Sequence, residues 1–194
     1  YMILRADWSP LLKNTEFKVY IIFFLGLAAL AINELTATLP LSEALLHGSF
    51  QSAALISSTG YATVGVMEFS KPLLVLFLSV MFVGGSLGST SGGLKVFRLV
   101  TMFKLLKTRL RSYSLPKTAV NKVKVDGEIV SDDAVKTISV LMFAWVSVTF
   151  VSALLIVVFD GVDFMGALSA SVSAVGNMGP LYLSGETLIG LSPA

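Results

Sequence analysis

Residues 138–159 read ISVLMFAWVSVTFVSALLIVVF, a run of 22 residues without a single charge. A helix rises about 1.5 Å per residue, so a run of this length crosses a bilayer core of about 30 Å. The rest of the chain is similar, because 55% of its 194 residues are hydrophobic and only 13% are charged, against roughly 25% charged in a soluble domain. We therefore predict an all-α integral membrane protein and exclude a soluble enzyme, a nucleic-acid-binding module and a disordered chain.

Rare side chains narrow the chemistry further. The chain contains no cysteine and one histidine, which excludes disulfides, thiolate metal sites and a His-rich zinc site. We expect no covalent chemistry, no bound cofactor and no nucleic-acid partner.

Two more apolar runs are predicted to enter the bilayer beside the span at 134–159. One forms a second span at 17–35. The other, PLLVLFLSVMFV, starts at Pro72 and has only 12 residues before it meets the tract GGSLGSTSGG at 84–93. It is too short to cross the membrane alone. Because apolar sequence resumes after the glycines, we predict a helix over 72–110 that is broken in mid-membrane by a glycine-rich loop.

A short, charge-poor run rich in Ser, Ala and Gly follows each span, at 41–57 and at 163–175. Both runs are too short to span, and re-entrant pore helices fit them better, since irregular backbone at membrane depth must be buried or face water. A glycine-containing turn follows each run, and laying Gly60 on Gly179 aligns the two turns. The predicted organisation is a membrane helix–pore helix–membrane helix unit at 1–112, a basic linker at 113–133, and a second, truncated unit at 134–194.

Charge placement predicts the orientation. All 14 lysines and arginines except Lys71 fall either before or at the start of the first span or within residues 95–136. By the positive-inside rule, the N-terminus of the chain and residues 95–136 lie on the cytoplasmic side of the inner membrane. We interpret the basic stretch first as a topology signal, with a lipid- or subunit-docking surface as a further role.

The turns after the two short helices predict the kind of ligand. A chain that leaves a re-entrant helix in extended form can point its backbone carbonyls at a pore axis and replace the water shell of a cation. Glycine suits such a segment because it has no side chain and adopts unusual backbone angles. The negative end of each short helix would add to the attraction.

Three motifs, in this order and spacing, resemble the Trk/Ktr/HKT superfamily of potassium transporters in its TrkH-like branch. They are STGYAT at 58–63, FVGGSLGSTSGGLKVFR at 82–98 and GNMGP at 176–180. The resemblance covers essentially the whole chain. It implies four span–pore helix–span units around one pore, of which this chain carries the third and the fourth.

The resemblance also implies roles for particular residues. Carbonyls of two segments would line the potassium filter: Ser57, Ser58, Thr59 and Gly60, and Gly176, Asn177, Met178 and Gly179. A gating loop beneath the filter would comprise Gly84, Gly85, Ser86, Gly88, Ser89, Thr90, Gly92 and Gly93. Potassium would be the transported substrate, held by backbone carbonyls. Family members form homodimers and pair with a cytoplasmic nucleotide-binding subunit of the TrkA or KtrA type.

The chain departs from the family pattern in three ways. The first and second units are absent, the last span is cut short, and Met178 stands where a smaller aliphatic residue is expected. Because half the units cannot close a fourfold pore, either the chain is a fragment or two copies must assemble. We favour a C-terminal fragment whose N-terminal pore units belong to the same polypeptide.

Other interpretations compete for the glycine-rich tract. Residues 84–88 match the G-x-S-x-G nucleophile elbow, so an intramembrane serine hydrolase using Ser86 with His47 as base is one alternative. The glycine spacing also fits plain helix packing, and a non-conducting structural membrane subunit is another alternative. Lys95 either snorkels toward the cytoplasm, or projects toward the pore or pairs with a loop carbonyl and so forms a barrier to cations.

Overall fold

The computed structural model describes residues 12–113 and 123–178. Gly179, the rest of the GNMGP segment, most of the first half of the predicted linker and the tail after residue 178 lie outside the described residues. The described elements are α3 (Thr15–Leu35), α4 (Leu41–Ser57), a 3₁₀ turn (Val66–Glu68), α5 (Lys71–Val83), α6 (Val96–Ser112), β1 (Lys124–Val125), β2 (Glu128–Ile129), α7 (Asp132–Asp160) and α8 (Phe164–Gly176).

Helices α3, α7 and α8 each start at a side chain that caps them. Asn14 accepts a hydrogen bond from the N–H of Phe17 at the start of α3, and Ser131 and Asp163 do the same for α7 and α8. Such caps satisfy N–H groups that the first turn of a helix leaves free. The helices cover the predicted spans 17–35 and 134–159 and begin two residues earlier in each case.

Helices α3 and α7 are long and apolar enough to cross a membrane. A core helix of a soluble protein would be largely buried, but only 11% of the most apolar window of α7 is buried inside the molecule. Phe143 and Phe159 are each 75% exposed. Apolar side chains exposed all along a helix of 29 residues indicate that lipid or further membrane helices cover it.

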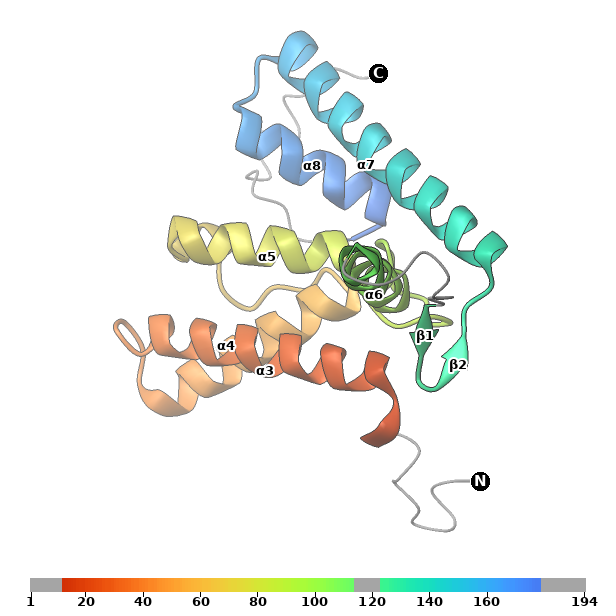
Figure 1. Cartoon of the computed structure of the whole chain (residues 1–194). Coiled ribbons are helices and arrows are strands. Elements are labelled where there is room, and N and C mark those ends of the chain that lie inside the picture. Colours follow the sequence, from red (N-terminus) through yellow and green to blue (C-terminus); the bar gives the residue numbers. More distant parts are fainter. Residues whose placement is uncertain (1–11, 114–122, 179–194) are drawn as a thin grey trace.

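Two helices at each end of the described chain pair as a hairpin, α3 with α4 and α7 with α8. Helix α5 lies between the two pairs (Figure 1). Small residues allow close approach in both hairpins. A Cβ on Gly48 of α4 would lie 2.7 Å from Ile32 Cγ1 of α3. In the other hairpin, the hydroxyl of Ser171 donates to the carbonyl of Thr149 at 2.6 Å.

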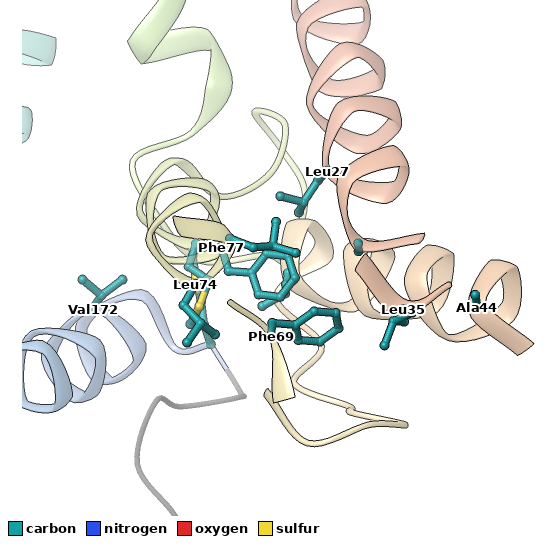
Figure 2. Packing of buried hydrophobic residues seen from close by; sticks show 12 residues of the cluster. Leu27, Leu35, Ala44, Phe69, Leu74, Phe77 and Val172 are labelled. Atoms are coloured by element: carbon teal, nitrogen blue, oxygen red, sulfur yellow. The ribbon is translucent and has the colours of Figure 1, made fainter. Parts of the chain in front are cut away.

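Helix α5 forms the centre of the core. Figure 2 shows Phe77 of α5 beside Phe69, with Leu27 of α3 on one side and Val172 of α8 on the other. The rings of Phe69 and Phe77 meet edge to face, with centroids 5.1 Å apart. Burial of these apolar side chains, at about 1.5–3 kcal/mol each, holds the two hairpins against α5.

The predicted linker contains a small β-hairpin that we did not expect in an all-α chain. Strands β1 and β2 pair antiparallel, with Lys124 opposite Ile129 and Val125 opposite Glu128. The turn residues Asp126 and Gly127 have φ values of 53° and 89°. Asp-Gly favours such a turn because both residues tolerate positive φ. The Asp-Gly turn was therefore visible in the sequence, but the strands beside it are too short to be predicted from the sequence.

Candidate functional site

The first predicted filter segment begins where α4 ends. Ser58 ends the helix in the left-handed conformation, with φ 59° and ψ 30°. Its N–H donates to the carbonyl of Leu55 at 3.3 Å, and the N–H of Thr59 donates to the carbonyl of Ala54 at 3.1 Å. This pair of bonds is the Schellman arrangement, which satisfies carbonyls left free at a helix end.

Helix α8 ends in the same way. Asn177 is left-handed, with φ 48° and ψ 51°. Its N–H donates to the carbonyl of Ala174 at 3.3 Å, and the N–H of Met178 donates to the carbonyl of Ser173 at 2.8 Å. Each donor and acceptor therefore has a counterpart in α4, with Asn177 in the place of Ser58.

The match of the two helix ends has the same register as the alignment of Gly60 on Gly179. Ser57 and Gly176 are the last helical residues of α4 and α8, and Gly60 follows with a φ of 79°. Gly179 lies outside the described residues. Both helices present the negative end of the helix dipole at these ends, an arrangement that attracts cations.

The glycine-rich loop separates α5 from α6 and closes on itself. The N–H of Leu94 donates to the carbonyl of Phe82 at 3.2 Å, and the N–H of Lys95 donates to that of Val83 at 2.8 Å. Gly84, Gly88 and Gly93 have φ values of 72°, 84° and 83°. The predicted break in the helix is thus a compact loop whose two ends are held side by side. In Figure 1, α5 lies across the view while α6 is seen end-on.

Lys95 folds back over this loop. Its Nζ donates to the carbonyl of Ser89 at 2.9 Å and also to the carbonyl of Ser91. Its backbone φ of 74° is unusual for a residue with a side chain. The ammonium group thereby neutralises two carbonyl dipoles and links the far side of the loop to the start of α6.

The loop packs against the end of α8. A Cβ on Gly92 would overlap the carbonyl oxygen of Gly176, and a Cβ on Gly93 would lie 2.9 Å from Met178 Cε. Only glycines fit here. The structure therefore brings Gly92 and Gly93 of the predicted gating loop to one predicted filter segment, and the sequence did not specify which residues would meet.

Two acidic side chains that we did not predict connect the first turn of α3 to remote parts of the chain. Glu16, in the first turn of α3, accepts a hydrogen bond from the backbone N–H of Leu87. Next to it, Asp126 of the β-hairpin accepts from the N–H of Thr15 at 3.1 Å and from its hydroxyl. The sequence signal for Glu16 was an acidic residue at the end of an apolar run. We did not single it out, because an acid in the first turn is common at helix N-termini.

Ser86 and His47 do not form the nucleophile and base of a hydrolase among the described residues. Ser86 lies in the loop, where its carbonyl accepts from the N–H and the hydroxyl of Ser89 at 3.1 and 2.6 Å. Buried His47 Nδ1, on α4, has no hydrogen-bond partner in the described part of the chain. The geometry gives no support to the hydrolase interpretation.

Comparison with known proteins gives consistent results. A family model described as "TrkH: Cation transport protein" matches residues 13–184. The chain is 30% identical over 186 residues to the Trk system potassium uptake protein TrkI of Halomonas elongata, and 26% identical over 182 residues to TrkG of Escherichia coli. These alignments cover 95% and 92% of this chain.

The fold is also similar to a solved one. The crystal structure of the potassium transporter TrkH from Vibrio parahaemolyticus superposes with a TM-score of 0.77 and 26% sequence identity over 92% of this chain. The chain spans 37% of the length of both relatives and 40% of that solved chain. The named relatives are ion uptake proteins and not enzymes.

Proposed function

The chain belongs to the TrkH family of cation transport proteins, as its motifs predicted, and on that premise we propose that it takes part in potassium uptake across the cell membrane. The observation that carries this proposal is the matched ending of α4 and α8. Two short helices with the same terminal hydrogen bonds are what two copies of a filter-forming unit require.

In this proposal, potassium passes between the ends of the short helices. Backbone carbonyls of residues 57–60 and 176–179 replace the water of the ion. The side chain of Met178 does not interfere, because it is 7% exposed and belongs to the core cluster with Phe77 and Val172. The larger side chain at this filter position is therefore accommodated behind the backbone.

The loop at 84–93 acts as a gate in this proposal. This proposal is supported by the close approach of Gly92 to the carbonyl of Gly176, which leaves no space for a Cβ between them. Lys95 brings a positive charge to the same place, and a charge there raises the barrier to a passing cation. Opening would require the loop to move away from α8.

The proposed assembly includes further chain segments and partners. A pore of four units needs two units besides these, and the relatives are more than twice as long as this chain. We place the protein in the inner membrane, as a homodimer with a TrkA- or KtrA-type cytoplasmic subunit. Helix α6 offers a basic surface for that subunit with Lys104, Lys107, Arg109 and Arg111 beside exposed Leu106 and Leu110.

The test is selectivity in the protein expressed at full length in cells that lack their own potassium uptake. Gly60→Ser forces a side chain onto a φ of 79°, at a cost of about 1–3 kcal/mol. We expect Gly60→Ser and Gly179→Ser each to lower the preference for potassium over sodium roughly tenfold. The measurement is ion uptake at matched protein abundance.

Gly26→Ser is the matched control, because a Cβ at Gly26 meets nothing within 4 Å. Normal selectivity in both filter variants would contradict the filter assignment. A full-length protein that moves no potassium would instead favour a structural membrane subunit.

A further inference from the structure

The two filter segments differ in how a hydroxyl group attaches them to their short helices. In α8 the hydroxyl of Ser173 donates to the carbonyl of Met178, while the N–H of Met178 donates to the carbonyl of Ser173 at 2.8 Å. Two bonds therefore join the same two residues. Both residues are largely buried, at 6% and 7% exposure.

The corresponding residues of the other segment are Ala54 and Thr59, by the match of the helix ends. Here the N–H and the hydroxyl of Thr59 both approach the carbonyl of Ala54, at 3.1 and 3.3 Å. The hydroxyl comes from the filter residue and not from the helix. Since Ala54 has no donor in its side chain, it cannot hold the carbonyl of Thr59 in the way that Ser173 holds that of Met178.

A filter carbonyl held by a hydroxyl behaves differently from a free one. The hydrogen bond draws the oxygen of Met178 toward α8 and uses one of its lone pairs, so it both directs the carbonyl and weakens its field. Selectivity among cations depends on the position, number and field strength of such carbonyls. The Met178 side chain is itself buried, and its Cε lies 2.9 Å from a Cβ placed on Gly93.

We propose that Ser173 is a positioning residue that fixes the Met178 carbonyl and so sets the ion preference of the second filter segment. This inference rests on the proposed filter function. It makes the two segments chemically unequal: the carbonyl of Met178 is held by a hydroxyl of its own short helix, and within residues 12–113 and 123–178 its counterpart at Thr59 has no such bond.

The test compares Ser173→Ala with Ser173→Thr in the full-length protein. The readout is the ratio of potassium to sodium and rubidium uptake, which does not depend on how much protein reaches the membrane. Ser173→Ala frees the carbonyl, and we expect the potassium-to-sodium ratio to fall roughly three- to tenfold, the size of one lost hydrogen bond. Ser173→Thr keeps a hydroxyl and should retain most of the ratio.

Ser171→Ala is the matched control, because Ser171 is also a buried serine of α8 but donates to Thr149 of α7 at 2.6 Å. Loss of this hydrogen bond should lower the abundance or thermal stability of the protein and leave the potassium-to-sodium uptake ratio unchanged. An unchanged ratio in Ser173→Ala, or an equal fall in Ser171→Ala, would overturn the inference. If Gly60→Ser still lowers selectivity in that case, the proposed filter survives without the role of Ser173.

Discussion

Gly92 is the residue at which the loop and the end of α8 come closest. Glycine is required at this position because a Cβ would overlap the carbonyl oxygen of Gly176. At Gly88 the backbone conformation favours glycine, because the φ is 84° although a Cβ there would meet nothing within 4 Å. Two glycines of one loop are thus required for separate physical reasons, and substitutions can test them separately.

We expect Gly92→Ala to push the loop away from α8 and to raise the potassium leak several-fold, since an added methyl in a filled site costs about 1–3 kcal/mol. Gly88→Ala should strain the backbone by about 1 kcal/mol and change the leak little. The measurement is potassium efflux from loaded cells or vesicles. Equal leaks in the two variants would show that the contact with Gly176 does not close the pathway.

At the scale of elements, the first turn of α3 connects parts that are remote in the sequence. Glu16 accepts a hydrogen bond from the N–H of Leu87 in the loop, and the N–H of Thr15 donates to Asp126 of the β-hairpin. At the other end of α3, Glu34 accepts from the N–H and the hydroxyl of Ser70, just before α5 begins. One long helix therefore fixes the hairpin, the loop and the start of α5.

Removing the contact at Glu16 should loosen the loop. In Glu16→Ala the N–H of Leu87 loses its acceptor, so we expect hydrogen–deuterium exchange across residues 84–95 to become several-fold faster. Glu43→Ala is the control, since Glu43 is an exposed acid in the first turn of α4. Unchanged exchange in Glu16→Ala would mean that the backbone bonds of the loop suffice to hold it.

At the scale of the whole molecule, charge is strongly separated. The basic residues of α6 lie at one end of the predicted membrane arrangement, and Lys71 at the start of α5 lies at the other. The net charge of +2 hides this separation. A basic surface on the predicted cytoplasmic side would keep the basic segment from crossing the membrane and would offer a docking surface to a cytoplasmic subunit.

Thiol labelling tests this orientation directly, because the chain has no cysteine of its own. Lys71→Cys should react with a membrane-impermeant maleimide added outside intact cells, and Lys107→Cys should react only after permeabilisation. Both side chains are exposed, so access differs only by side of the membrane. Labelling in the reverse order would invert the predicted topology.

Local properties of the sequence determined the helices, the loop between α5 and α6 and the positions of the short helices, because span length, apolar runs and glycine tracts act through neighbouring residues. The β-hairpin also had a local signal in Asp126-Gly127, but its strands are only two residues long. Only the tertiary structure decided that Gly92 meets Gly176, that Glu16 holds Leu87 and that Ser173 binds the carbonyl of Met178. Those contacts depend on how helices dock and how a helix end turns, which no periodicity of one segment specifies.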